Sequence, residues 1–228
     1  MSKLNNALTK YWRTLLALTL GLLVSEYARA SGVDQNPPQS KWFMRTGPLW
    51  VAYQSSADIT LMGNTLPGAS ARARNNVTLM LDLGYEVTDN FSVLVMGGIP
   101  PRTAVEGAGS VEALGTFGVV RFGPLFLTGV YRLPSRYGVT PYLGTGMAHA
   151  FILKNYDGAV SDLDVHGNSG PVVQMGVEYE WTERWKLFLD YKHLWLKLDA
   201  YGTLTDAPVK AKITLDPDLL SMGIAFHF

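Results

Sequence analysis

The chain has 228 residues, no cysteine, and equal numbers of basic and acidic residues. The lack of cysteine excludes disulfides and thiolate metal sites, and the absence of a basic run or an acidic tail gives no support to a nucleic-acid partner. Hydrophobic residues make up 47% of the chain, yet none of the apolar runs after residue 30 approaches the roughly 20 residues of a transmembrane helix. The apolar residues must therefore follow another pattern.

Residues 1–30 are predicted to be a cleavable signal peptide. Three basic residues precede an apolar run over 15–24, and Ala28-Arg29-Ala30 supplies small residues at both positions of a cleavage site. An anchoring helix is the alternative, but ten apolar residues are too few to span a bilayer. Residues 31–228 then form one exported domain of 198 residues with 15 basic and 18 acidic side chains, a net charge of −3.

Strict alternation of apolar with small or polar residues predicts β-strands. It is clearest over 77–88, 172–181 and 219–228, where every second residue is apolar. In chain order we expect eight strands, near 42–58, 75–88, 91–101, 115–134, 139–153, 168–182, 185–199 and 209–228. Tight turns at 88–90, 134–138 and 182–184 alternate with longer loops at 59–74, 102–114, 154–167 and 200–208.

The strand pattern favours an all-β, eight-stranded antiparallel transmembrane barrel over a soluble sandwich. The strands are long, and Tyr85, Tyr131, Tyr179 and Trp181 end their apolar faces, where an interfacial girdle of aromatic residues would lie. Short turns at one rim and long loops at the other predict an up-and-down meander with both termini periplasmic. Phe226 and Phe228 end the last strand in a pattern typical of the signal for the outer-membrane assembly machinery.

Several segments resemble the OmpW family of outer-membrane proteins. They include Met44-Arg45-Thr46-Gly47, Thr88-Asp89-Asn90, the stretch 141–146 (PYLGTG), and the end of the chain from Val209 to Phe228. Within the family, the segments 64–67, 122–124, 157–159 and 201–204 resemble in order those of the members associated with alkane uptake.

The resemblance implies a barrel through which small hydrophobic molecules cross the bacterial outer membrane passively, with outer-membrane lipid and lipopolysaccharide as its surroundings and no cofactor. One position departs from the family pattern. The inward face of the third strand often carries an acidic residue in the family, where this chain has Leu94. Polar features of that position are therefore not carried over.

The alternation also predicts what faces the lumen. Leu94 and Met96 are expected near mid-barrel, Met80 in the upper half, and Pro100 above them, giving an apolar path for a solute. The alternative is that the methionines only fill space, a common use of this flexible side chain.

Charges of both signs are predicted to gather near the periplasmic rim and to close it as a charged floor. Unpaired buried charge is costly, so these groups should pair with one another. The residues of the predicted floor are Arg45, Asp82, Glu86, Arg132, Glu178, Glu180, Asp190 and Lys192.

A solute blocked by that floor would leave sideways through the wall. Pro100 and Pro101 end the third strand, and Pro124 lies in the neighbouring fourth strand. Proline has no N–H for the ladder, so hydrogen bonding should be thinnest at this seam, the predicted lateral exit. The alternative is that Pro100 and Pro101 simply end a strand and Pro124 marks a bulge.

Enzymatic and receptor functions are the other classes considered. None of the four histidines has a serine and an acid placed for a nucleophilic site, so we expect no catalytic residue. His166 with the aspartates of 157–164 suits a solvated loop better than a metal site. A structural barrel, or a surface receptor that acts through its loops, remains the main alternative, although it has no need of an apolar lumen.

Overall fold

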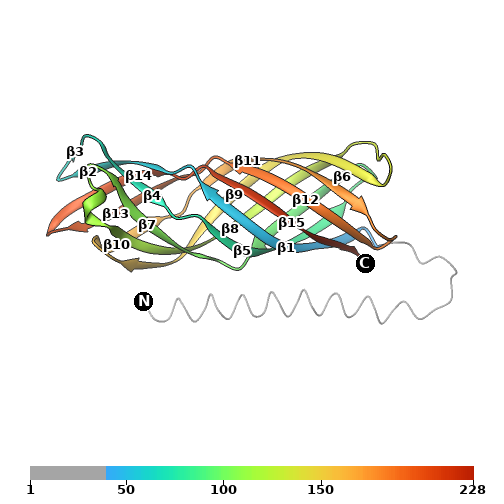
Figure 1. Cartoon of the computed structure of the whole chain (residues 1–228), viewed down its shortest axis with the longest axis horizontal. Coiled ribbons are helices and arrows are strands. Elements are labelled where there is room, and N and C mark those ends of the chain that lie inside the picture. The colour runs from blue at the N-terminus through green and yellow to red at the C-terminus, as the bar shows by residue number, and fades with distance from the viewer. Residues whose placement is uncertain (1–39) are drawn as a thin grey trace. The chain divides into compact units, whose positions relative to one another are not determined.

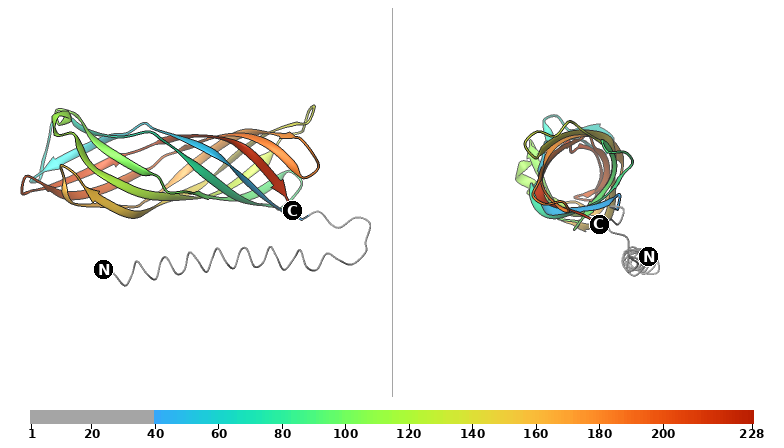
Figure 2. Two further views of the ribbon diagram at one scale, coloured as in Figure 1. Left: turned by 60° about the horizontal axis from the view of Figure 1, so that its bottom comes forward. Right: turned by 90° about the vertical axis from the view of Figure 1, so that its right-hand side faces the viewer.

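Residues 40–228, which a computed structural model describes, form a closed antiparallel β-barrel (Figures 1 and 2). The predicted signal peptide lies outside the described residues. Each of eight strands pairs with its neighbours in chain order, and the last pairs with the first to close the wall. The eight strands are β1 (Trp42–Tyr53), β5 (Asn76–Glu86), β6 (Phe91–Gly98), β8 (Thr116–Arg132), β9 (Val139–Asp157), β11 (Ser169–Glu180), β12 (Trp185–Leu194) and β15 (Pro217–His227).

The three tight turns and both described chain ends lie at the same rim, here called the turn end. Backbone bonds join them: the Ser40 N–H donates to the Phe228 carbonyl at 3.1 Å, and the Arg132 N–H donates to the Asn90 carbonyl at 2.7 Å. The eight predicted strands and the alternation of short and long connections are confirmed.

The predicted long loops are wrong as loops, because most of their residues form strands. These extend the barrel away from the turn end as β2 (Ser56–Leu61), β3 (Asn64–Thr65), β4 (Ala69–Ala73), β7 (Arg102–Gly109), β10 (Ser161–His166), β13 (Lys197–Leu204) and β14 (Ala207–Thr214), with a short 3-10 helix, η1 (Glu112–Leu114). We call this part the extension. About 9–11 residues suffice for a strand to cross a bilayer, whereas β8 and β9 have 17 and 19 residues and continue into the extension.

The outer wall of the barrel is apolar, as the alternation predicts. On β5, Val77, Leu79 and Leu81 are half or more exposed, and the apolar sets on β11 and β15 point outward in the same way. Aromatic residues cluster near the turn end, where the Trp42 and Tyr85 rings lie 4.9 Å apart. A soluble protein would not leave so continuous an apolar surface in water.

Along β9 the sequence alone does not show which set of alternating residues faces lipid, and the structure assigns the two faces. On β9, Ala148 and Ala150 are buried inside, whereas Leu143, Met147 and Phe151 point outward. Small inward residues let neighbouring strands and larger side chains meet across a narrow barrel. A Cβ on Gly84, for example, would lie 2.2 Å from the Phe43 ring, so that ring fills the space of the missing side chain.

Candidate functional site: an apolar interior above a charged floor

Arg45 on β1 stands at the centre of a buried network near the turn end. Its Nε donates to Asp82 of β5 at 2.8 Å, and a second guanidinium nitrogen also pairs with that carboxylate. Another donates to the Tyr142 hydroxyl at 2.9 Å, and Glu178 and Asp190 each have an oxygen 3.8 Å away. The Arg45 and Asp82 side chains are 1% and 0% exposed, so almost every polar atom must find its partner inside.

Lys192 and Arg132 extend the network to the other strands. Lys192 pairs with Asp190, which also accepts hydrogen bonds from the Tyr142 hydroxyl and the Gln174 amide, both at 2.6 Å. These contacts tie β9, β11 and β12 to β1 through side chains alone.

Arg132 makes the second link to the wall. It donates to Glu178 at 3.1 Å and to the Ser92 hydroxyl at 2.6 Å, and Glu86 lies 3.7 Å away. Glu86 in turn lies 3.3 Å from His227 at the rim.

The network is balanced in charge where it is deepest. Three cations (Arg45, Arg132 and Lys192) and three carboxylates (Asp82, Glu178 and Asp190) are all buried. Seven of the eight predicted floor residues come together, and we keep the name charged floor for those seven. Glu180 is not among them: it is the last residue of β11, is exposed, and forms no ion pair with a described residue, because the strand ends there and turns into solvent.

Tyr142, Gln174 and Ser92 also belong to this network, and sequence reasoning missed them. Tyr142 is 1% exposed and bridges Arg45 to Asp190. Its position could not be predicted while the inward face of its strand was undecided. Gln174 and Ser92 lie on faces predicted to be inward, so their polar character in a crowded barrel was the available signal.

An apolar core begins on the far side of the floor from the turn end. Met80 and Met96 are 1% and 2% exposed and pack in one cluster with Phe126 and Val172. Leu94 does not join them. Met96 lies opposite Asp82 in the β5–β6 ladder, whereas Leu94 lies opposite Gly84, two residues nearer the turn end. There it packs with Phe43, Val130 and Tyr142. Of the predicted apolar path, the two methionines lie in this cluster, whereas Leu94 and Pro100 do not.

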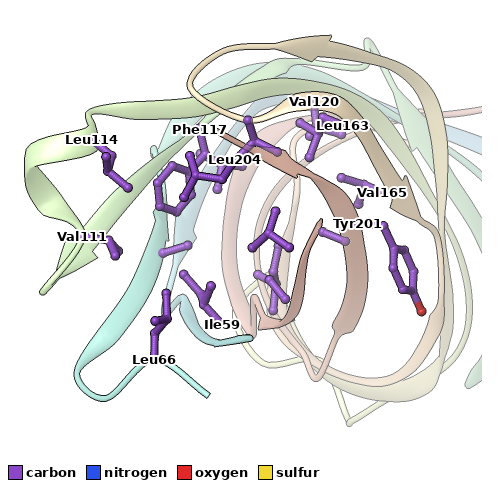
Figure 3. A pocket seen from close by; sticks show the side chains of 17 residues that line it. Ile59, Leu66, Val111, Leu114, Phe117, Val120, Leu163, Val165, Tyr201 and Leu204 are labelled. Carbon is purple, nitrogen blue, oxygen red and sulfur yellow. The ribbon is translucent and has the colours of Figure 1, made fainter. Parts of the chain in front are cut away.

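The core opens into an apolar pocket inside the extension (Figure 3). Its lining includes Ile59, Val105 and Val165 from three different strands, and some space between these side chains is left unfilled and partly open to solvent. A smaller pocket lined by Ala73, Phe122 and Leu215 continues toward the methionines. None of these lining residues was predicted, because most lie where we expected loops.

An interruption in the ladders of the wall lies next to the predicted proline seam. The β6–β8 ladder ends at Met96 opposite Phe126, and the β7–β8 ladder begins at Arg102 opposite Arg121. Residues 97–101 therefore carry no ladder pair with 122–125. We call this the ladder break.

Pro100, Pro101 and Pro124 all lie at the ladder break. On its other edge, Pro124 pairs normally with β9 opposite Ala150, and the β8–β9 register shifts between Arg121 and Phe122. A bulge and an opened ladder are thus both present at this seam.

The described residues give no support to a membrane-spanning helix or a metal site. Among residues 40–228, no helix is long and apolar enough to cross a membrane, and no group of three His, Cys, Asp or Glu side chains is arranged to hold a metal ion. His166 contacts Asp164 at 3.0 Å on an exposed strand.

A closed antiparallel barrel with an apolar outer wall defines a transmembrane β-barrel of the bacterial outer membrane. Residues 39–228 match the family model of the OmpW family, and the chain belongs to that family.

Curated relatives agree with this assignment. The chain is 33% identical to the outer membrane protein AlkL of Ectopseudomonas oleovorans over 75% of the chain and 74% of that protein. It is 35% identical to the dibenzothiophene metabolism operon protein PahQ of Pseudomonas aeruginosa over 83% of the chain and 90% of that protein.

Solved structures show the same fold. The crystal structure of OprG from Pseudomonas aeruginosa aligns with a TM-score of 0.77 at 19% identity, covering 83% of this chain and 97% of that one. The solid-state NMR structure of AlkL in lipid bilayers aligns with a TM-score of 0.67 at 28% identity, covering 87% and 95%.

Proposed function

We propose that this protein is a passive route for small hydrophobic molecules into the outer membrane. The observation that carries the proposal is the apolar interior, which begins in the extension and continues to the methionines without a charged side chain in either pocket lining. Pockets for small ligands are typically apolar and concave. A barrel that served only as a structural element would be expected to fill this space.

The relatives narrow the class of solute. One is named for a dibenzothiophene metabolism operon, and dibenzothiophene is a fused aromatic molecule with little polarity. The resemblance to alkane-uptake barrels points to aliphatic chains. Both kinds of molecule suit an apolar lining with few polar atoms to satisfy, so we propose the class and leave the individual solute to experiment.

The charged floor sets the direction of the route. A solute that continued toward the turn end would have to separate Arg45 from Asp82, and separating a buried ion pair costs about 3–5 kcal/mol. The ladder break lies beside the apolar core. Residues 97–101 have no ladder bonds to β8, so a solute that passed between them would break none. We therefore propose that solutes leave sideways there, into the lipid.

Uptake by whole cells tests the proposal. Cells that contain an alkane-oxidising enzyme should oxidise octane or a bulkier terpene faster at low external concentration when the barrel is present. Ala71, 3% exposed, lines the pocket, and Ala71→Asp should abolish the gain because a carboxylate would lie in the apolar route. Ala104→Asp is the matched control: the same change on a β7 position that alternates with inward Thr103 and Val105 should leave uptake unchanged.

Equal oxidation with and without the barrel, with enzyme level and cell lysis controlled, would overturn the proposal. The structural or receptor function would then be favoured, and Ala71→Asp would be silent in every uptake assay while deletions in the extension affected surface binding.

A disulfide across the ladder break tests the lateral exit. A Cβ on Gly123 would lie 3.5 Å from the Cβ of Pro100, and disulfides need about 3.5–4.5 Å between Cβ atoms. Because the chain has no cysteine, Pro100→Cys with Gly123→Cys gives a single defined bond.

The oxidised form of this variant should take up solutes more slowly, and a reductant should restore the rate. Val95→Cys with Leu127→Cys, opposite one another in the intact ladder, is the control and should transport equally in both states. A locked break with undiminished uptake would reject the lateral exit while leaving the uptake proposal standing.

A further inference from the structure

Three basic side chains lie side by side on the outer face of the extension, on three neighbouring strands. Arg102 of β7 is the register partner of Arg121 on β8, and Arg121 is the partner of Lys154 on β9. We call them the basic row. The side chains of Arg102 and Lys154 converge on the ring of Tyr156, at 5.5 and 4.8 Å from its centroid.

Like charges at directly opposed positions of a sheet repel, so the row needs an explanation. None of its members forms an ion pair with a described residue. β7, β8 and β9 contain only two acidic side chains, Glu106 and Asp157. Glu106 pairs with Arg74, and Asp157 accepts a hydrogen bond from the Leu163 N–H at 3.0 Å.

The nearby acidic residues of β10 do not neutralise the row either. Asp164 contacts His166 on its own strand at 3.0 Å. Asp162, also exposed, makes no ion pair with a described residue.

The net positive charge lies on one side of the extension. β4, β7 and the parts of β8 and β9 above the ladder break carry four basic and two acidic residues. The other sheet of the extension, formed by β2, β3, β10, β13 and β14, carries three basic and four acidic residues. A general solubilising surface would not be expected to divide in this way.

The basic row lies where the apolar outer wall ends. Directly toward the turn end are Ile99, Leu125 and Leu153, which are 58%, 44% and 47% exposed. Side chains of that kind face acyl chains, so the next positions outward lie at the level of the lipid headgroups. Tyrosine is favoured at this level because its ring is apolar and its hydroxyl is wet.

From this placement we propose that the basic row binds the phosphate groups of lipid A, the phosphorylated glycolipid anchor of lipopolysaccharide, in the outer leaflet. A guanidinium group can bind two oxygens of one phosphate through two parallel N–H groups, and the lysine ammonium adds a further positive charge. The ring of Tyr156 positions two of the three cations by cation–π contact. The proposal is independent of the transport function, and it places one bound lipid beside the ladder break.

Native mass spectrometry of the full-length folded barrel in detergent, at fixed ionic strength, tests the proposal. The probes are bisphosphorylated lipid A, the same lipid with both phosphates removed, and inorganic phosphate as competitor. The test variant carries Arg102→Gln, Arg121→Gln and Lys154→Gln. The control removes the same number of charges from the other sheet, through Lys197→Gln, Lys210→Gln and Lys212→Gln.

The wild type and the control should prefer the phosphorylated lipid, and the test variant should lose about tenfold in that preference, since exposed charge contacts are each worth a few-fold in affinity. Arg121→Gln alone, at the centre of the row, should give a smaller loss in the same direction and covers the case in which the triple variant folds poorly. An unchanged preference in the test variant, or an equal loss in the control, would overturn the proposal. So would inorganic phosphate binding to the row as tightly as lipid A, which would make it a site for free anions.

Discussion

Replacing Arg45 by methionine should destabilise the barrel more than any substitution on its outer face. Arg45 is within 3.8 Å of three carboxylates, those of Asp82, Glu178 and Asp190, and its side chain is 1% exposed. Arg45→Met leaves these three buried acids with only Arg132 and Lys192. Removing one partner of a buried pair costs about 3–5 kcal/mol, and we expect the free energy of unfolding to fall by that amount.

A double variant separates charge imbalance from lost packing. In Arg45→Met with Asp82→Leu, two cations face two carboxylates and apolar side chains of similar volume replace the ion pair. Such replacements are often neutral or stabilising, so the double variant should regain most of the stability that the single variant loses. The assay is urea unfolding in lipid vesicles, followed by tryptophan fluorescence and by the gel mobility of the folded barrel.

The same variants test whether the floor closes the lumen. The wild-type barrel should pass little ionic current in a planar bilayer, and the single variant should pass more because unpaired carboxylates attract water and cations. A single variant that loses less than about 1 kcal/mol, or a double variant as unstable as the single, would refute the view that these charges hold one another in a buried, balanced set.

Three further substitutions follow from the packing. Gly84→Ala should lower the free energy of unfolding by about 1–3 kcal/mol, because the new Cβ would lie 2.2 Å from the buried Phe43 ring. Gly97→Ala is the control in the same urea titration and should be nearly neutral, because the nearest neighbour of its Cβ would be 4.0 Å away. Ala200→Leu, at a position 6% exposed in the pocket lining, should slow hydrocarbon uptake without reducing the amount of folded barrel, whereas outward Ala104→Leu should change neither quantity. Phe228→Ser should lower the amount of barrel assembled in cells if the terminal aromatic is read as an assembly signal; equal heat-modifiable protein in both strains would reject that role.

The barrel itself could be predicted because alternation is a local signal. Successive side chains of a strand point to opposite faces, so the direction of one residue fixes that of the next. Val77, Leu79 and Leu81 therefore point to lipid, and Asp82 points inward. The charged floor followed because buried charges of both signs have few arrangements other than pairing. Glu180 was misplaced since alternation says nothing about where a strand ends.

The extension and its pocket could not be predicted by that method. Its strands are short, and Ala69, Ala71 and Ala73 give little hydrophobic contrast against their neighbours in sequence. They become strands because β7 and β14 supply partners distant in the chain. The level of Leu94 was misjudged for a related reason: counting along one strand does not give the register with the next, and the offset places it beside Phe43 rather than beside the methionines.

The choice of residues inside the extension bears on whether its pocket is a route or a packing defect. A core selected for stability alone is filled to high density, and an unfilled cavity destabilises a protein by about 24 cal/mol per Å³. Here Ala71, Ala200 and Ala211 occupy inward positions on three strands where larger apolar residues would close the space. Near the methionines, by contrast, the buried Phe126 ring fills the interior. The same chain therefore packs densely beside the floor and keeps space where a solute would enter, a division that favours an uptake route over a structural barrel.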